Sequence, residues 1–344
     1  KKLQRLQRRS NKMKLGITGC GMIVNDLFRF IHDVEGVELE AMASIPAEYE
    51  KVQELAKANQ VKKTYQCFED MLKDEEVEVI YLGVPNHLHY DMAKQALLAK
   101  KHVICEKPFT SRVEELEELA RLAKDEGLFL LEAISTQYLP NVLKIKELLD
   151  EVGNVKIITA NYSQYSSRYN AFKEGTILPA FDYTKSGGAM MDLNIYNVHL
   201  MVALFGKPLN VEYQANIERG IDTSGIMTLD YGTFKAVLIG AKDCKAPIST
   251  NIQGDKACIN IITPANQLRD FHLLRNDGTQ EDYNLQGDTH RMYYEFVEFV
   301  NIIDGKDMPR AQAMMEKSLI AMDILTKARK SAGIRFTADE MWEK

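Results

Sequence analysis

The sequence lacks the features that would assign it to a membrane or secreted class of protein. No run of eighteen apolar residues occurs among its 344 residues, so no segment is expected to span a membrane. Its five cysteines are scattered and form no CxxC pair, which argues against disulfides and a cysteine zinc site and favours a reducing cytoplasm. The chain has no internal repeat and no low-complexity segment. A cytoplasmic protein without a bound metal is therefore expected.

An excess of charge of one sign is also missing. The formal net charge of −6 gives no indication of nucleic acid or an acidic lipid surface as a partner. Residues 1–14 are an exception, because they carry seven lysines and arginines and no acid. This basic arm, residues 1–12, has no apolar segment of the kind found in signal peptides. We interpret it as a leader or a helical arm ahead of Met13 rather than a nucleic-acid tail, since the rest of the chain is acidic.

The length of 344 residues is enough for two domains. In residues 13–134, apolar strand-like segments alternate with helical ones, a pattern that predicts an α/β domain with a doubly wound parallel sheet. In residues 135–344, short strands are joined by tight-turn sequences, which predicts an α+β domain with a large antiparallel sheet. The strands expected there are Val155–Tyr162, Val211–Glu218, Gly225–Asp230, Phe234–Gly240, Ser249–Gln253, Cys258–Ile262, Phe271–Leu274 and Glu281–Leu285.

A glycine-containing turn follows the first strand. The apolar segment Lys14–Thr18 runs into Gly19, Cys20 and Gly21, and an amphipathic helix follows. Glycine lets the backbone approach a pyrophosphate, and a strand before and a helix after are the context that a dinucleotide-binding fingerprint requires. Val24 occupies the third position of this fingerprint, where a small residue is usual. The turn therefore predicts a dinucleotide site with one departure from the pattern.

Small or polar residues also end the next strands. Ser44 stands where an NAD enzyme usually offers an acid to the ribose, and a small neutral residue there tolerates a 2′-phosphate, so NADP is slightly favoured over NAD. After the strand Val77–Leu82, Asn86 can donate and accept hydrogen bonds, and His87 or His89 is expected to reach a ribose. The alternative for each histidine is a half-buried structural role.

The segment Glu106–Lys107–Pro108 follows the apolar strand Val103–Cys105. In a parallel sheet, ligands bind beyond the carboxyl ends of the strands. Pro108 fixes its own φ and biases Lys107 away from helix, so the ammonium group is expected to be held at the edge of the ligand site. The alternative is an ordinary surface lysine at a strand-to-helix turn.

In the second half, Gly187 and Gly188 precede a helix that carries Asp192, Tyr196 and His199. The spacing of four residues puts the carboxylate and the phenol on one helical face, and His199 lies on much the same face. Such spacing is also common on helix surfaces, so the pair taken alone favours a structural role. His199 is expected either to line the same pocket or to fill it.

A cluster of tyrosines with one arginine follows the first strand of the second half. Its members are Tyr162, Tyr165, Arg168 and Tyr169. These side chains are expected either to form a wall of the substrate pocket or to belong to a subunit interface.

Taken together, these motifs resemble those of the Gfo/Idh/MocA oxidoreductase family. The resemblance covers about residues 13–335. It implies an N-terminal Rossmann domain, an NAD or NADP cofactor, and a C-terminal antiparallel sheet that builds the interface of a homo-oligomer, dimer or tetramer. The segments that carry it are Gly19–x–Gly21, Pro85–Asn86, Glu106–Lys107–Pro108 and Gly187–Gly188 with Asp192–x–x–x–Tyr196.

The resemblance also implies roles for single residues. Lys107 matches the catalytic lysine and a cofactor contact, Asp192 matches its acidic partner, and Tyr196 matches a position that is tyrosine in the dihydrodiol dehydrogenase type. The Lys107–Pro108 peptide bond is expected to be cis. The other positions that match cofactor contacts are Gly19, Gly21, Met22, Ile23, Pro85, Asn86 and Glu106.

These expectations combine into one reaction. Hydride transfer between an alcohol carbon and a nicotinamide needs a group that takes the hydroxyl proton, and a free tyrosine, with a pKa near ~10, is a poor base at neutral pH. A nearby lysine ammonium stabilises the phenolate and the developing alkoxide. We therefore expect Tyr196 as general acid/base, Lys107 as electrostatic stabiliser and proton relay, and Asp192 as the carboxylate that orients Lys107. Whether Tyr196 or Lys107 accepts the proton first stays open.

The expected function is that of an NAD(P)-dependent oxidoreductase acting on a CH–OH group of a sugar, a polyol or a vicinal diol. Two other functions stay open: a dinucleotide-binding regulator without turnover, and a sugar hydrolase or epimerase that uses bound NAD transiently. The presence of Lys107, Asp192 and Tyr196 favours the dehydrogenase over the regulator.

Overall fold

The structure, a computed structural model, describes residues 12–341. The expectations about the basic arm therefore lie outside the described residues, apart from Lys12. The chain divides into two compact units. Unit 1 consists of the residues up to Phe109 together with Glu114–Ala133 and Met292–Glu316, and unit 2 consists of Thr110–Val113, Ile134–Arg291 and the residues from Lys317 onward. The units therefore do not divide the chain at a single point.

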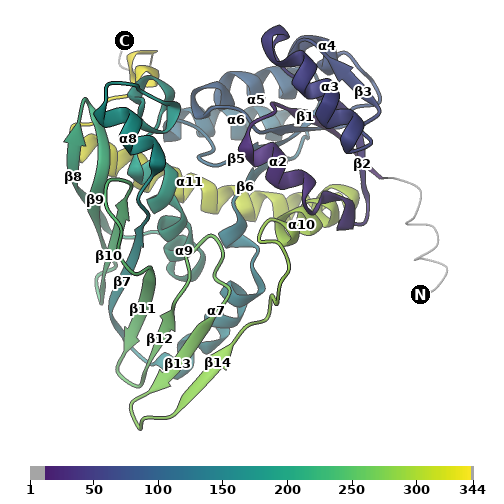
Figure 1. The fold of residues 1–344 in the computed structure, drawn as a ribbon. Helices are drawn as coiled ribbons and strands as arrows, with labels where there is room; N and C mark the ends of the chain where they lie inside the picture. Colours follow the sequence, from purple (N-terminus) through teal and green to yellow (C-terminus); the bar gives the residue numbers. More distant parts are fainter. Residues whose placement is uncertain (1–11, 342–344) are drawn as a thin grey trace, which may run out of the picture. The chain divides into compact units, whose positions relative to one another are not determined.

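Unit 1 is built on a six-stranded sheet in which every strand pair is parallel (Figure 1). The strand order β3-β2-β1-β4-β5-β6 reverses direction between β1 and β4, which confirms the expected Rossmann architecture. Its strands are β1 (Met13–Thr18), β2 (Val37–Ala43), β3 (Lys63–Tyr65), β4 (Val79–Leu82), β5 (His102–Glu106) and β6 (Leu130–Ala133). Its helices are α2 (Met22–Phe28), α3 (Tyr49–Ala58), α4 (Phe68–Leu72), α5 (His89–Leu98), α6 (Val113–Asp125) and α10 (Tyr293–Asp304).

Helix α10 belongs to the core of unit 1 although it lies far along the chain. The ring of Phe296 on this helix lies 5.6 Å from that of Phe30 and 5.7 Å from that of Tyr81 on β4. All three side chains are buried. Burial of aromatic rings of this size makes α10 a substantial part of the hydrophobic core on one face of the sheet.

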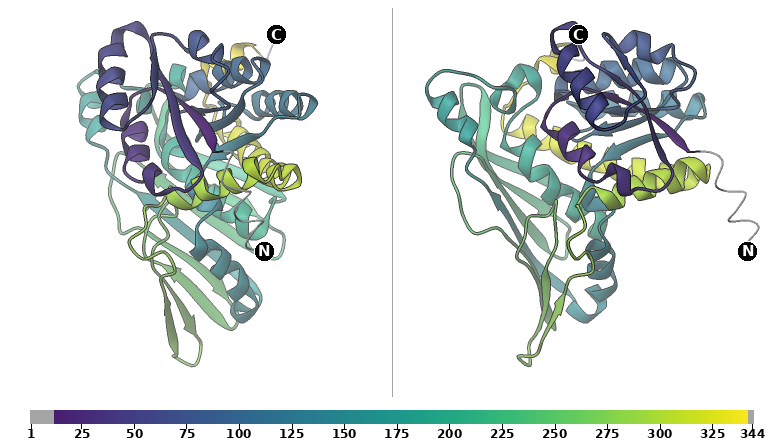
Figure 2. Two further views of the ribbon diagram at one scale, coloured as in Figure 1. Left: turned by 90° about the vertical axis from the view of Figure 1, so that its right-hand side faces the viewer. Right: turned by 45° about the vertical axis from the view of Figure 1, so that its right-hand side comes forward.

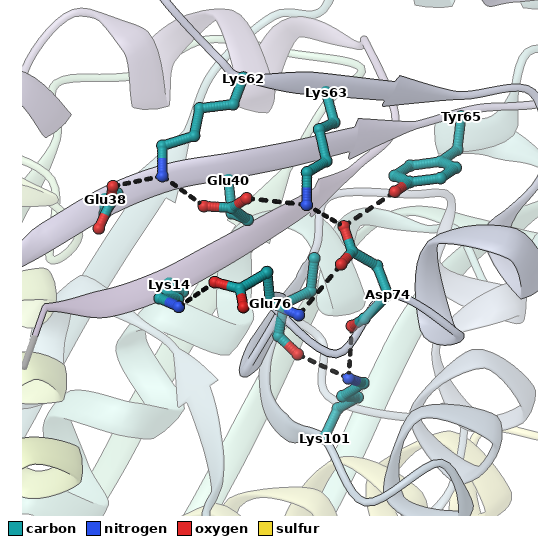
Figure 3. Close-up of polar contacts among 10 residues, drawn as sticks. Lys14, Glu38, Glu40, Lys62, Lys63, Tyr65, Asp74, Glu76 and Lys101 are labelled. Carbon is teal, nitrogen blue, oxygen red and sulfur yellow. Dashed lines mark hydrogen bonds and ion pairs between the residues drawn. The ribbon is translucent and has the colours of Figure 1, made fainter.

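A network of charged side chains lies at the amino ends of the unit 1 strands (Figure 3). The buried Glu40 carboxylate pairs with Lys62 at 2.8 Å and with Lys63 at 3.1 Å, and Lys63 also pairs with Asp74. Burial alone raises the pKa of Glu40, but the hydrogen bonds from Lys62 and Lys63 bring it below its ordinary value. The network lies at the opposite end of the sheet from the ligand-binding edge, so its role is to stabilise the fold.

Unit 2 is built on an eight-stranded sheet with the order β14-β13-β12-β11-β7-β10-β9-β8. Every pair is antiparallel except β7 and β10, which run parallel. All eight expected strands are present, and the large, mostly antiparallel sheet is confirmed. They are β7 (Val155–Ser163), β8 (Asn210–Glu218), β9 (Ile221–Asp230), β10 (Lys235–Ala241), β11 (Ser249–Gly254), β12 (Ala257–Ile261), β13 (Phe271–Arg275) and β14 (Gln280–Tyr283).

Helices α7 (Pro140–Val152) and α9 (Ile195–Phe205) lie on one face of this sheet, as Figure 2 shows from two directions. Alternation along β7 separates the faces, because Ile158 is buried and Ile157 is exposed. The other helices are α8 (Ser167–Lys173) and α11 (Met308–Ser331). Met190–Asn194 is a π-helical segment. The short 3₁₀ segments are Ile31–Asp33, Pro46–Glu48, Asn86–Leu88, Ser135–Gln137, Pro179–Phe181, Tyr183–Lys185 and Thr337–Met341.

A buried ion-pair cluster anchors the last described turn of unit 2. Asp339 accepts hydrogen bonds from the guanidinium of Arg329, at 2.8 Å for one pair of atoms, and from that of Arg112 at 3.3 Å. The backbone amide of Phe336 donates to the same carboxylate. Burial raises the pKa of Asp339, but Arg329, the Phe336 amide and Arg112 bring it below its ordinary value. The acid is therefore held ionised inside the protein.

Within residues 12–341, no helix is both long enough and apolar enough to cross a membrane. All five cysteines fall in this range, and all five are free thiols.

Candidate active site

The turn after β1 contains two glycines, and the backbone and its neighbours restrict the residue type at only one of them. Gly19 has φ of +96°, and a Cβ there would lie 2.6 Å from the carbonyl oxygen of Gly83, which follows β4. Gly21 has φ of −76°, and a Cβ there would meet no atom within 4 Å. The fold itself thus requires glycine at position 19 but not at position 21. Open space beside Gly21 fits the close approach of a dinucleotide pyrophosphate to the backbone.

The structure also explains the departure at the third fingerprint position. Val24 is buried on α2, and the Cγ2 of Val24 lies 2.8 Å from where a Cβ of Gly83 would be. The glycine that makes room for close packing of helix against strand is therefore supplied by the end of β4 instead of by α2.

Replacing Gly19 or Gly21 with alanine is expected to distinguish an effect on stability from an effect on cofactor affinity. Gly19→Ala is expected to destabilise the protein by about 1–3 kcal/mol, because alanine is strained at this positive φ and meets the Gly83 carbonyl. Gly21→Ala is expected to leave the unfolding midpoint nearly unchanged and to weaken binding of the reduced cofactor at least about tenfold. Denaturant unfolding and fluorescence titration with NADPH measure the two effects. Normal cofactor affinity in Gly21→Ala would contradict the assignment of this turn.

Ser44 directly follows β2, with its hydroxyl donating to the Ile45 carbonyl at 3.0 Å. Two charged residues of the next segment, Glu48 and Lys51, act on the thiol of Cys20 in the glycine turn. Burial raises the pKa of Cys20, Glu48 raises it further, and Lys51 lowers it. Both charged side chains therefore lie near the glycine turn, where no local motif predicts a basic residue.

His89 occupies a different place from the one expected. It is completely buried, with Nδ1 2.8 Å from the Pro108 carbonyl and Nε2 2.9 Å from the Val84 carbonyl. Burial lowers the pKa of His89, against the opposing effects of these carbonyls and of Glu132. The expectation of a direct contact with the cofactor is corrected accordingly: His89 joins the turn after β4, which carries Pro85 and Asn86, to the turn after β5.

Lys107 is half-buried at the end of β5, on a turn with several fixed points. The Lys107–Pro108 peptide bond is cis, as expected. The side chain of Glu106 is buried, accepts a hydrogen bond from the Tyr81 hydroxyl at 2.7 Å and accepts one from the backbone amide of Lys107 at 3.3 Å. Together with the bond from His89 to Pro108, these contacts hold the backbone that carries the Lys107 ammonium.

In unit 2, Gly187 and Gly188 allow a close approach that no other residue permits. A Cβ on Gly187 would lie 2.5 Å from the Pro179 carbonyl, and one on Gly188, at φ of +106°, would lie 2.0 Å from Oδ1 of Asp222. The buried Asp222 accepts hydrogen bonds from the Met190 amide at 2.7 Å and from the Tyr213 hydroxyl at 2.8 Å. The paired glycines thus let a buried acid hold the start of the helix.

Asp192 lies in the π-helical segment Met190–Asn194, and Tyr196 lies in the first turn of α9, which continues it. Such π-helical turns occur frequently at functional sites. Tyr196 is buried, with its ring 6.2 Å from that of Tyr162. The structure therefore places both expected residues in one helical segment of unit 2.

The three residues expected to contact substrate lie in different surroundings. His199 is completely buried, and its Nδ1 accepts a hydrogen bond from the Gln137 amide at 3.0 Å, which favours the alternative that it fills space beside the site. Tyr165 and Arg168 are exposed. The Tyr165 hydroxyl donates to Asn170 at 2.6 Å and accepts from Lys173 at 3.2 Å.

Sequence reasoning missed Lys242. This lysine directly follows β10, is 2% exposed, and forms an ion pair with Asp192. The available signal was a basic residue placed immediately after an apolar strand, as Lys107 is after β5. Its pairing with an acid fifty positions away in the sequence leaves no local trace.

The parallel Rossmann sheet with its glycine turn is the architecture of a dinucleotide-binding domain, the class to which NAD(P)-dependent oxidoreductases belong. Residues 13–133 match an oxidoreductase family with an NAD-binding Rossmann fold, and residues 142–260 match the GFO/IDH/MocA C-terminal domain. The chain belongs to the Gfo/Idh/MocA oxidoreductase family.

Known proteins similar to this chain include several dehydrogenases. It is 33% identical to scyllo-inositol 2-dehydrogenase (NADP(+)) of Bacillus subtilis (strain 168), over 95% of this chain and 99% of the relative. It is 24% identical to trans-1,2-dihydrobenzene-1,2-diol dehydrogenase of Sus scrofa, over 95% and 99% of the two chains. The solved structure of a levoglucosan dehydrogenase with NADH and levoglucosan shares the fold, with a TM-score of 0.81, 15% identity, and coverage of 94% of this chain and 98% of that one.

Proposed function

We propose that this protein transfers a hydride between NADP and a secondary alcohol carbon of a cyclic polyol, a sugar or a vicinal diol. The observation that carries the proposal is the full-length similarity to an NADP-dependent inositol dehydrogenase in a chain that has Lys107, Asp192 and Tyr196. Similarity to a dihydrodiol dehydrogenase over nearly the whole chain supports the wider class of vicinal hydroxyl groups.

The chain's own residues divide the work of such a reaction. A bound nicotinamide would supply or accept the hydride. Tyr196 takes the proton of the substrate hydroxyl in oxidation and returns it in reduction. Lys107 stabilises the charge on the phenol oxygen and on the substrate oxygen. Asp192 provides the negative charge that orients Lys107. Gly19, Gly21, Met22, Ile23 and Ser44 bind the dinucleotide, together with Pro85, Asn86 and Glu106.

An activity screen tests this function directly. Purified protein is mixed with NADP or NAD and a panel of inositols, sugars and vicinal diols, and absorbance of the reduced nicotinamide is followed. The proposal expects turnover with at least one of these alcohols. Cofactor binding without turnover of any of them would favour a regulator, and conversion of a sugar with no net change in the cofactor would favour a transient use of bound NAD.

We propose NADP as the preferred cofactor because a lysine lies near the glycine turn, where it is able to reach a 2′-phosphate. Ser44 leaves room for the phosphate, and the exposed Lys51, whose charge reaches Cys20 in the glycine turn, supplies positive charge. Lys51→Met is expected to raise the KM for NADP about tenfold and to leave the KM for NAD nearly unchanged, because only NADP carries the phosphate. Lys57→Met, an exposed lysine on the same helix, is the control. Equal effects of Lys51→Met on both cofactors would contradict this role.

We propose that the open face of the eight-stranded sheet joins two copies of the chain. Exposed β-branched residues on strands of this sheet support this, among them Ile157 on β7 and Ile226 on β9, two strands that flank β10. Light scattering on the purified protein is expected to give at least the mass of a dimer, and Ile226→Glu is expected to shift this mass toward that of the monomer.

The free thiols support a reducing, cytoplasmic location.

A further inference from the structure

Lys242 is a buried lysine with a backbone fixed on both sides. Its amide donates to the Thr223 carbonyl at 2.8 Å, and its own carbonyl accepts from the amide of Ser166 at 2.9 Å. Ser166 is also the N-cap of α8. The position of this side chain is therefore set by three separate parts of unit 2: β10, β9 and α8.

The surroundings of the Lys242 ammonium combine a charge, an aromatic face and a second acid. The ammonium pairs with Oδ2 of Asp192 and lies 4.9 Å from the ring centre of Phe181. Its charge also acts on Asp222, whose pKa burial raises to about 6 against the lowering effects of the Met190 amide, the Tyr213 hydroxyl and Lys242. A buried ammonium is costly unless such partners compensate it.

The ion pair is asymmetric in its exposure to solvent. The Lys242 side chain is 3% exposed, whereas that of Asp192 is 39% exposed. The Lys242 ammonium therefore lies inside unit 2, and the Asp192 carboxylate lies between it and the solvent. Among the described residues, Asp192 is the acid that forms an ion pair with Lys242, whereas Asp222 interacts with it only through its charge and accepts hydrogen bonds from Met190 and Tyr213. Protonation of Asp192 would leave a buried ammonium without the neutralising charge of its ion-pair partner.

We infer that Lys242 is a positioning residue that keeps Asp192 in place as an ionised carboxylate throughout turnover, so that Asp192 acts as a fixed charge and carries no proton. This inference rests on the proposed function. It also reduces the number of groups that can accept the proton of the substrate hydroxyl. That proton then passes through the phenol or the lysine ammonium of the proposed site. A second consequence is that the effect of Lys242 on the reaction depends on the charge of Asp192.

The test is a double-mutant cycle on Lys242→Met and Asp192→Asn. Lys242→Met keeps the length of the side chain and is expected to lower kcat about 10- to 100-fold, the usual effect of removing a group that orients an active-site side chain. The Kd for NADPH is expected to change less than about twofold, because the residues proposed to bind the dinucleotide all belong to unit 1, whereas Lys242 belongs to unit 2. The double variant is expected to be no slower than Asp192→Asn alone.

Two further variants and two checks of folding make the outcome clear. Lys235→Met removes another lysine of β10, one that pairs with Asp230 at the surface, and is expected to keep the wild-type kcat. Lys242→Gln serves as a second variant, and unfolding midpoints together with NADPH binding identify any variant that does not fold. A kcat within about twofold of the wild type in both folded Lys242 variants, or losses that multiply in the double variant, would overturn the inference. Failure of the proposed function itself would be seen separately, as an inactive wild type and an inactive Lys235→Met.

Discussion

Replacing Lys107 with methionine is expected to lower kcat by about 10²–10⁴-fold, the usual contribution of a group that assists proton transfer. Methionine keeps most of the side-chain volume but removes the charge that is proposed to stabilise the phenolate and the developing alkoxide. Cofactor affinity is expected to survive, because the turn is held by Tyr81, Glu106 and His89, and none of these contacts uses the ammonium group. Steady-state kinetics with the best alcohol of the screen, and NADPH titration by fluorescence, measure the two quantities.

The control for this variant is Lys73→Met, which removes an exposed lysine of unit 1 that pairs with Asp70. It is expected to keep the kcat of the wild type. If Lys107→Met folds, binds NADPH and turns over at the wild-type rate, Lys107 has no part in the chemistry and the proposed mechanism is wrong.

Asp339→Asn is expected to be the most destabilising substitution considered. Loss of its charge leaves the 1%-exposed Arg329 and the buried Arg112 without their shared carboxylate, and breaking a buried pair in this way costs about 3–5 kcal/mol. The denaturation midpoint in urea, compared with the wild type, measures the effect.

The matched control is Asp70→Asn, which breaks the exposed pair with Lys73. Exposed pairs of this kind contribute little, so no measurable change in the midpoint is expected. Equal effects of the two substitutions would show that the Asp339 cluster is not a buried support of unit 2.

Local patterns in the sequence are sufficient to predict most of the fold. Strands of unit 2 such as β11 and β13 lie within one or two residues of the expected ranges, because alternation and turn residues mark both ends of a strand. The parallel pairing of β7 with β10 could not be predicted, since tight turns indicate antiparallel neighbours only between strands that are consecutive in the chain. The same limit applies to α10, which packs on Tyr81 from a distant part of the sequence.

For the candidate site, the sequence predicts residue types better than their surroundings. Lys107 stands out because a strand, an acid and a proline fix its place, and the structure adds the contacts that hold this turn. His89 and Lys242 depend on partners from other parts of the chain, Pro108 and Asp192, so their burial and pairing are properties of the folded chain alone. The π-helical segment around Asp192 is likewise invisible in the sequence, because its apolar spacing resembles that of an ordinary helix.

Lys107 of unit 1 and Tyr196 of unit 2 are proposed to serve the same chemical step. The most direct measurement is kcat for Lys107→Met, for Tyr196→Phe and for the variant with both changes, each checked for NADPH binding. Residues that act as a unit are strongly non-additive, so the double variant is predicted to be about as slow as the slower single variant. Losses that multiply would show two independent contributions and would contradict the account.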